Sequence, residues 1–153
     1  IVGESPALEA LLAARRARGP GAAPANLVVV GGPGAGKTTL VRRLARAFAK
    51  GRAGEPRAPR IWSTSADRII AGMVYLGMWQ ERCLKMIREL GGEGDYLHVG
   101  ELRAFLEPQP DGTSLAEMFD GALAAGEVSL IAECTPSELV RATRALPSAM
   151  QAL

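Results

Sequence analysis

The 153-residue chain is poor in several features that define large classes of protein. Its two cysteines, Cys83 and Cys134, lie far apart in the sequence, which predicts reduced thiols and neither a disulfide framework nor a cysteine metal site. No apolar run approaches the ~20 residues that a membrane-spanning helix needs. The formal net charge of +2 gives no electrostatic footprint for nucleic acid. We therefore expect a soluble, cytoplasmic protein that binds neither membranes nor nucleic acid.

The length of the chain suits one domain. With 48% hydrophobic residues it has enough apolar material for a core, and it is too short for two ordinary domains. Its first residues, IVGESPALEA, lack the charged-then-apolar order of a signal peptide. Because the chain starts without Met and stops abruptly at MQAL, we expect residues 1–153 to be a single domain of a longer protein.

Apolar strands and amphipathic helices alternate along the chain. A run of β-branched residues at Leu27–Val30 predicts a buried central strand, and Ser114 is a predicted helix cap. Alternation of this kind predicts an α/β fold with a parallel sheet covered by helices on both faces. The predicted strands are 27–30, 61–64, 96–99 and 128–132, and the predicted helices are 5–18, 37–50, 67–71, 78–90 and 114–125.

The strongest chemical signal is the stretch GGPGAGKTT, which follows the first predicted strand and opens a predicted helix. It fits the phosphate-binding pattern G-x-x-x-x-G-K-[ST] through Gly31, Gly36, Lys37 and Thr38. The glycines let backbone N–H groups face the phosphates at the positive end of the helix. Lys37 would reach the β- and γ-phosphates, and the Thr38 hydroxyl would ligate Mg²⁺. The motif predicts a site for ATP or ADP with Mg²⁺, formed by Gly32, Pro33, Gly34, Ala35, Gly36, Lys37, Thr38 and Thr39.

The rest of the sequence narrows the class of P-loop protein. The only asparagine, Asn26, precedes the P-loop, so the Asn-Lys-x-Asp base reader of GTP-binding switch proteins is absent. A small-molecule kinase would carry an arginine-rich lid and substrate-binding carboxylates where this chain has IIAGMVYLGMWQERCLKMI. That segment resembles the AAA+ module of Clp-type unfoldases. The matching positions are Ala71, Gly72, Tyr75, Gly77, Glu81, Arg82 and Leu84, with Trp79 in place of the family's aromatic residue.

The resemblance extends over nearly the whole chain. Ile1-Val2-Gly3 resembles the family's opening turn beside the adenine pocket, and GALAAGEVSLIAECTPSEL, from Gly121, is similar to its fourth-strand region. The resemblance implies an AAA+ large subdomain, a P-loop NTPase fold with a parallel five-stranded sheet between helices. It places the fifth strand at the very end of the chain, places the helical lid outside it, and adds Val2 and Gly3 to the nucleotide-binding residues.

The resemblance also assigns a role to Tyr75. In the family this tyrosine faces the central pore of a hexameric ring and grips the polypeptide that is being threaded. By this resemblance Tyr75 contacts a protein substrate or adaptor, and the full-length protein forms a homo-oligomeric ring. Gly72 and Gly77 on either side give such a loop freedom to move. The alternative is a tyrosine packed at the start of the next helix.

The third strand departs from the family's catalytic pattern. In the family this strand ends in Asp-Glu, where the aspartate holds the Mg²⁺ shell and the glutamate orients the attacking water. The matching pair in YLHVGEL is Gly100-Glu101. Because catalysis at such sites is mostly electrostatic positioning, loss of the aspartate predicts hydrolysis slower by orders of magnitude. Glu101 is the candidate catalytic residue, either as the water-activating base or merely as a solvated carboxylate where a helix starts.

Two further departures lie toward the end of the chain. Cys134 stands where the family has a polar sensor near the γ-phosphate, and Thr135 or Glu133 would substitute only if the backbone shifted by one residue. Ser148 and Ala149 stand where the family has paired arginine fingers. The single histidine, His98, is expected to be a core or hydrogen-bonded residue of the third strand, and Arg141 and Arg144 are expected to be surface charges.

An intact binding loop beside altered catalytic positions favours a nucleotide-binding module. We expect weak or no hydrolysis of ATP and a role in assembly or regulation of a Clp-like protein. The alternative is an active ATPase module of a motor that remodels or unfolds proteins.

Overall fold

The structure of the chain is a computed structural model that describes residues 6–17, 25–50, 58–72, 77–91 and 94–145. The helices in this part of the chain are α1 (Pro6–Ala17), α2 (Lys37–Ala49), α3 (Ala66–Ile70), α4 (Met78–Leu90), α5 (Leu102–Leu106), α6 (Leu115–Ala124) and α7 (Pro136–Ala145). The strands are β1 (Leu27–Val30), β2 (Ile61–Ser63), β3 (Tyr96–Glu101) and β4 (Ser129–Cys134).

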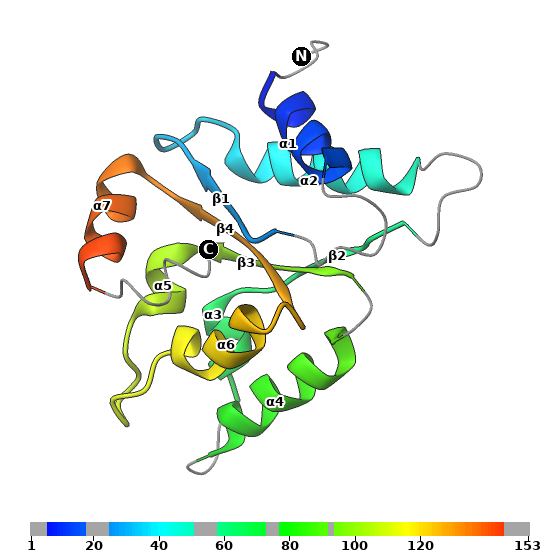
Figure 1. Cartoon of the computed structure of the whole chain (residues 1–153). Helices are drawn as coiled ribbons and strands as arrows, with labels where there is room; N and C mark the ends of the chain where they lie inside the picture. The colour runs from blue at the N-terminus through cyan, green and yellow to red at the C-terminus, as the bar shows by residue number, and fades with distance from the viewer. Residues whose placement is uncertain (1–5, 18–24, 51–57, 73–76, 92–93, 146–153) are drawn as a thin grey trace.

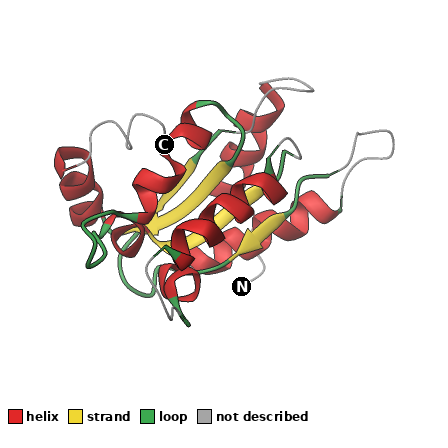
Figure 2. Cartoon of the chain, turned by 90° about the horizontal axis from the view of Figure 1, so that it is seen from below, coloured by secondary structure: helices red, strands yellow, loops and turns green. Residues whose placement is uncertain are grey.

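The four strands form one parallel sheet in the order β1-β4-β3-β2. Helices α1 and α2 cover one face, whereas α3, α4 and α6 cover the other (Figure 1). Figure 2 shows the strands between these helices. The α/β fold predicted from the alternating pattern is confirmed. The expected fifth strand falls in residues 146–153, which lie outside the described residues.

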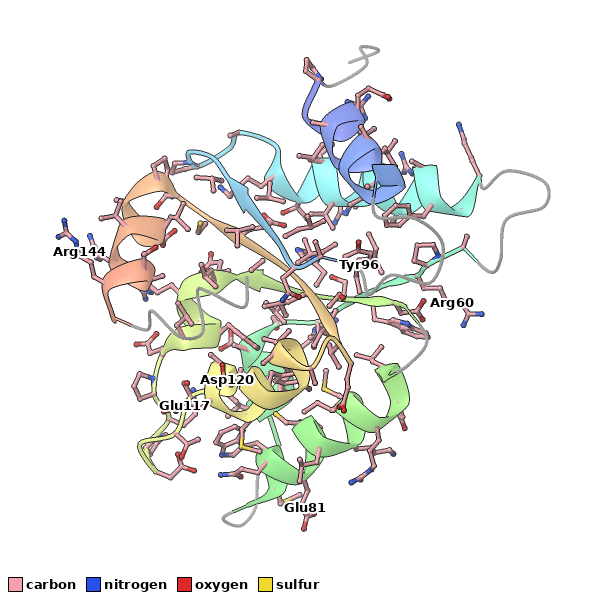
Figure 3. The ribbon with its side chains drawn as sticks, in the orientation of Figure 1. Arg60, Glu81, Tyr96, Glu117, Asp120 and Arg144 are labelled. Carbon is pink, nitrogen blue, oxygen red and sulfur yellow. The ribbon has the colours of Figure 1, made fainter. Side chains whose placement is uncertain are left out.

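Alternate side chains of the strands feed two apolar clusters, one on each face of the sheet. The larger cluster, on the face of α4 and α6, contains the completely buried Leu130 and Phe119. The smaller cluster, against α2, contains Phe48 and Tyr96, whose rings stack with centroids 5.8 Å apart. Figure 3 shows Tyr96 between the sheet and α2. Burial of each large side chain contributes about 1.5–3 kcal/mol, so both helix layers are held firmly on the sheet.

Helix starts follow local capping chemistry. The Ser114 side chain accepts a hydrogen bond from the backbone N–H of Glu117, and the Glu117 carboxylate accepts one from the Ser114 backbone, which closes a capping box at α6. Thr135 and Glu138 form the same arrangement at α7. The Thr135 backbone N–H and hydroxyl both donate to the Glu138 carboxylate, and these two bonds hold its pKa below its ordinary value. The sequence TPSE has the spacing of a capping box, although the predicted helices do not include α7.

Several expectations about single elements are settled by the structure. Strands β3 and β4 each end two residues later than predicted. The sequence did not indicate these residues because glycine and glutamate, here Gly100 and Glu133, are uncommon in strands. Cys83 and Cys134 are free thiols, and both are buried, which the sequence analysis did not address. Among the described residues, no helix combines the length and the apolar character needed to cross a bilayer.

The end of β3 is irregular at Gly100. The pairing of β3 with β4 shifts register between His98 and Glu101, and Gly100 has a φ of +71°. This is the left-handed region, which side chains with a Cβ adopt only with strain. Space is not the obstacle, because a Cβ at Gly100 would lie 4.0 Å from the nearest atom, the carbonyl oxygen of Thr64. The backbone itself therefore favours glycine where the family has its aspartate.

Arg82 joins α3 to α4. Its Nη1 donates hydrogen bonds to the carbonyl oxygens of Arg68, Ile69 and Ala71 at 3.0, 2.7 and 2.9 Å. The last carbonyls of a helix have no partner within it, so the guanidinium satisfies the carboxyl end of α3. The bond to the Ala71 carbonyl also holds the backbone immediately before Gly72.

Replacing Arg82 tests this contact. Arg82→Ala is expected to lower the free energy of unfolding by about 1.5–3 kcal/mol, because charge-assisted hydrogen bonds to backbone acceptors are lost. Urea unfolding followed by circular dichroism measures the change. Arg88→Ala, on the exposed side of the same helix, is the control and is expected to change stability by less than about 0.5 kcal/mol. Equal effects of the two substitutions would show that Arg82 acts only as a surface charge.

Two glycine-to-alanine substitutions test the strain at Gly100. Gly100→Ala is expected to destabilise the chain by about 1–2 kcal/mol, because of its positive φ. Gly121→Ala is expected to stabilise it by up to about 1 kcal/mol, since Gly121 is in α6 and, apart from its chain neighbours and the nearby backbone of its own helix, no described atom lies within 4 Å of the added Cβ. Thermal unfolding of both variants measures the difference. A stable Gly100→Ala protein would contradict the left-handed conformation.

Candidate functional site

The P-loop connects β1 to α2 as its motif predicts. At its start, the backbone N–H of Gly31 donates to the carbonyl oxygen of Cys134 at 3.0 Å, which anchors the loop to the end of β4. A Cβ on Gly31 would lie 3.2 Å from that of Ala35, so the close approach favours glycine. Gly34 and Gly36 have φ values of 71° and 83°. These glycines allow the backbone to wrap around a small central space.

The loop and the first turn of α2 are suited to an anion. Gly36 is the N-cap residue, and within the described part of the chain no side chain caps this helix. Its first N–H groups are therefore available to a ligand, at the positive end of the helix. Lys37 Nζ donates to the carbonyl oxygens of Gly31 and Gly32 at 2.9 and 3.0 Å. An ammonium group has three N–H donors, so one remains to face a phosphate.

The other predicted binding residues fall into two groups. Five of them are exposed on the loop or the first turn of α2: Gly32, Pro33, Gly34, Ala35 and Thr39. Val2 and Gly3, assigned by resemblance to the adenine side, lie outside the described residues.

A row of polar side chains crosses the sheet beside the P-loop, on the face covered by α2. We call Ser63, His98, Glu133 and Thr38 the polar row. Ser63 Oγ lies 2.9 Å from His98 Nδ1, and His98 Nε2 lies 2.9 Å from Glu133 Oε1. At the other end, the Thr38 hydroxyl donates to Glu133 Oε2 at 2.9 Å. Three strands and the P-loop helix are thereby connected.

The polar row satisfies every side chain in it when Glu133 is a carboxylate. A carboxylate only accepts, so His98 donates through Nε2, and in the neutral imidazole Nδ1 then accepts the Ser63 hydroxyl. His98 is 5% exposed and Glu133 is 7% exposed. Buried polar groups need such partners. The prediction that His98 is a buried, hydrogen-bonded residue is confirmed.

The remaining predicted catalytic positions do not converge on the P-loop in this way. Glu101 is exposed at the N-cap position of α5, just beyond the irregular Gly100. The Cys134 side chain is buried in the larger apolar cluster, and this burial raises the pKa of its thiol. The Thr135 hydroxyl is engaged in the capping box of α7. Of the two possible substitutes for the sensor, only Glu133 hydrogen-bonds to a P-loop residue.

Arginine and tyrosine candidates are placed as follows. Arg141 and Arg144 are exposed on α7, and Figure 3 shows Arg144 on the outer side of that helix. The positions that correspond to arginine fingers, Ser148 and Ala149, lie outside the described residues, as does Tyr75.

Thr38 and Glu133 suit a hard divalent cation. Mg²⁺ prefers oxygen ligands and is usually held by one or two carboxylates together with phosphate oxygens and water. Among the described residues there is no cluster of three or more His, Cys, Asp or Glu side chains that would hold a metal by itself. The Thr38 hydroxyl and the Glu133 carboxylate fit a cation that would also be held by nucleotide phosphates.

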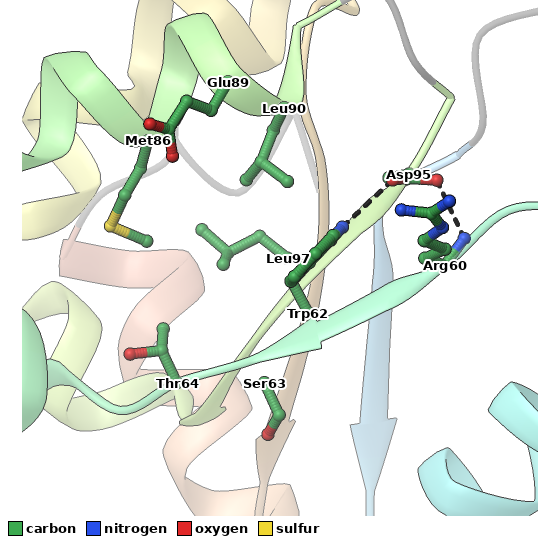
Figure 4. Close-up of a pocket in the computed structure, with 9 residues that line it drawn as sticks. All are labelled: Arg60, Trp62, Ser63, Thr64, Met86, Glu89, Leu90, Asp95 and Leu97. Carbon is green, nitrogen blue, oxygen red and sulfur yellow. Dashed lines mark hydrogen bonds between the residues drawn. The ribbon is translucent and has the colours of Figure 1, made fainter.

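A separate cavity of about 490 Å³ lies between the edge strand β2 and α4 (Figure 4). Its lining includes Trp62 and Leu90, and the Trp62 indole donates to Asp95 at 3.0 Å. The same carboxylate accepts the backbone N–H of Arg60 at 2.8 Å. The cavity shares Ser63 with the polar row and includes no described P-loop residue, so it is distinct from the candidate nucleotide site.

Comparison with known proteins finds relatives among Clp proteins. No family model matches the chain. The chain is 27% identical over 126 residues to the chaperone protein ClpB 2 of Parasynechococcus marenigrum, a match that covers 80% of this chain and 14% of that protein. It is 30% identical over 117 residues to the ATP-dependent Clp protease ATP-binding subunit ClpC of Staphylococcus epidermidis, covering 74% of this chain and 14% of that protein.

The fold is also found in a solved structure. The closed state of Hsp104 with ATPγS and FITC casein superposes with a TM-score of 0.79 at 18% identity, covering 100% of this chain and 26% of that one. This structural similarity shows the fold, whereas the sequence similarity to ClpB and ClpC proteins shows the relationship to that family. The chain thus spans a small part of the proteins that it matches. Taken with the P-loop geometry, the relatives identify this chain as an AAA+ ATPase module of the Clp type.

Proposed function

We propose that this chain binds ATP or ADP with Mg²⁺ and hydrolyses ATP weakly or not at all, as a module that serves assembly or regulation of a larger Clp-like protein. The observation that carries the proposal is a well-formed P-loop beside a β3 end that offers no carboxylate at Gly100. Nucleotide binding can persist when hydrolysis is lost. Phosphate binding needs backbone N–H groups and a lysine, whereas turnover needs a positioned water and stabilisation of charge in the transition state.

Nucleotide binding is supported by the loop geometry. The uncapped first turn of α2, the left-handed glycines and the Lys37 ammonium all favour phosphate groups. The curated relative from Staphylococcus epidermidis is named as an ATP-binding subunit, and the Hsp104 structure contains ATPγS. ATP or ADP is therefore the nucleotide that we assign to this site.

Slow turnover is supported by the side chains at the strand ends. Gly100 supplies no carboxylate, and Cys134 places a buried thiol where the resembling family has a polar sensor. A protonated thiol is a weak hydrogen-bond donor. Both changes remove interactions that a transition state would use more than a bound nucleotide does.

The wider role follows from the partial coverage of the relatives. We propose that residues 1–153 are one large subdomain of a longer cytoplasmic protein that assembles into a homo-oligomeric ring and engages a protein substrate or adaptor through Tyr75. Gly72 and Gly77 flank that tyrosine, and their φ values of 74° and 94° are those that glycine adopts readily. The Hsp104 neighbour is a complex with casein, which is the precedent for a protein substrate.

An active motor module is the alternative function. It is favoured by one observation, since Glu101 is exposed at the end of β3, where a carboxylate has access to water. In that case Glu101 would act as the general base for an attacking water.

Nucleotide binding is tested at Lys37. Lys37→Ala is expected to weaken binding of a fluorescent ADP analogue by at least about 100-fold, because the charge and one phosphate donor are lost. Lys50→Ala, at the other end of α2, is the matched control and is expected to bind as the wild type does. Titration by fluorescence anisotropy measures both. Binding by Lys37→Ala at wild-type affinity would refute the P-loop as the nucleotide site.

Turnover is tested at Glu101. We expect a wild-type rate well below ~1 per second and little change in Glu101→Gln, measured as phosphate release at saturating ATP and Mg²⁺. A rate on the order of 1 per second or faster that drops sharply in Glu101→Gln would instead establish the active motor.

A further inference from the structure

We propose that Glu133 supplies, from β4, the metal-holding carboxylate that is missing at Gly100 on β3. The inference rests on the proposed nucleotide binding and adds a residue to that site. It restores a carboxylate for the metal, so that slow turnover then rests on the buried Cys134 thiol at the sensor position. It concerns the carboxylate that is hydrogen-bonded to the Thr38 hydroxyl, whereas the family's corresponding acid is on the third strand.

The contact that carries the inference is the hydrogen bond from the Thr38 hydroxyl to Glu133 Oε2, 2.9 Å long. Thr38 is the P-loop residue whose hydroxyl ligates Mg²⁺ in P-loop NTPases, where an acidic side chain is its partner in holding the metal. A carboxylate hydrogen-bonded to that hydroxyl would help to hold and orient it for the cation. Glu133 would thus have the role that an aspartate at position 100 is expected to have.

The strand order gives β4 direct access to the P-loop. In the order β1-β4-β3-β2, β4 lies directly beside β1, the strand that leads into the P-loop. Glu133 pairs in register with Val29, one residue before the end of β1. The end of β3 is one strand further away and bends at Gly100. A carboxylate on β4 therefore reaches the first turn of α2 more directly than one on β3.

Burial argues for a purpose beyond packing. A carboxylate that is only 7% exposed loses much of its hydration and needs compensating donors. Thr38 supplies one donor and His98 supplies the other, one to each oxygen. These two donors satisfy its oxygens, and a cation bound beside Thr38 would balance its charge.

Ser63 and His98 are positioning residues for Glu133. The ring of His98 is held at Nδ1 by Ser63 and fixes Oε1 of Glu133, which leaves Oε2 directed at Thr38. Outer partners of this kind orient the groups that hold a metal. Mg²⁺, when bound with the nucleotide, would neutralise phosphate charge, and the protein's part is to keep the hydroxyl and carboxylate oxygens turned to the same point.

The experiment separates nucleotide binding from metal binding in the full 153-residue chain. Affinity for a fluorescent ADP analogue is measured in EDTA and in Mg²⁺, and Mn²⁺ binding to the ADP-loaded chain is measured by electron paramagnetic resonance. Glu133→Gln is expected to keep the EDTA affinity within about twofold and to lower Mn²⁺ affinity about 10–100-fold. Glu127→Gln, an exposed glutamate just before β4, is the matched control and is expected to match the wild type.

The possible results are distinct. Wild-type Mn²⁺ affinity in a folded Glu133→Gln protein overturns the inference, as does a loss of that affinity confined to Glu101→Gln. A wild type that binds nucleotide equally well with and without the divalent ion also overturns it, while the proposed function stands. A wild type that binds no nucleotide in either condition defeats the proposed function itself.

A measurement on the unaltered chain is independent of how the variants fold. The chain has one histidine, so both ring ¹⁵N resonances belong to His98, and their couplings to the ring C–H protons distinguish Nε2 from Nδ1. Adding Mg²⁺ to the ADP-loaded protein is expected to shift this resonance, because Nε2 donates to the carboxylate that the cation attracts. An unchanged Nε2 resonance at saturating Mg²⁺ contradicts the inference.

Discussion

The hydrogen bond between Thr38 and Glu133 is the contact on which the arrangement of the site depends, because it joins the first turn of the P-loop helix to the centre of the sheet. Below it, the stacked rings of Phe48 and Tyr96 hold the same helix on the same face. Apolar contacts near the amino ends of the strands thus fix where α2 lies, and polar contacts near their carboxyl ends fix what its first residues face. In open parallel sheets, ligands bind at that end.

The P-loop and the α/β fold were predictable because their signals are local. The stretch GGPGAGKTT predicts a phosphate-binding loop from its own residues. A run of β-branched residues such as Leu27–Val30 is typical of buried strands in parallel sheets. The polar row was not predictable, because which side chains meet depends on strand order and on a register shift at Gly100. His98 and Glu133 are 35 residues apart, and no spacing rule connects them. Glu133 entered the sequence analysis only as a conditional substitute for the sensor.

The two faces of the sheet divide stability and function between them. The face of α4 and α6 carries the larger apolar cluster, whereas on the face of α2 apolar packing gives way to polar side chains at the carboxyl ends. A ligand that binds the folded state alone stabilises it by mass action, by about 2.7 kcal/mol at a concentration 100 times its dissociation constant. Nucleotide binding would thus reinforce the face on which the chain's own packing is smaller.

The distance along the chain between paired groups has a consequence for the order of folding. Thr38 and Glu133 are separated by 95 residues, and Asn26, which receives the Leu130 backbone N–H, is separated from it by 104. Closing such long loops is entropically expensive until the strands between them have docked, and contacts of this range form slowly. During synthesis the P-loop therefore emerges long before its partner strand, and its orientation on the sheet is completed only when β4 inserts between β1 and β3.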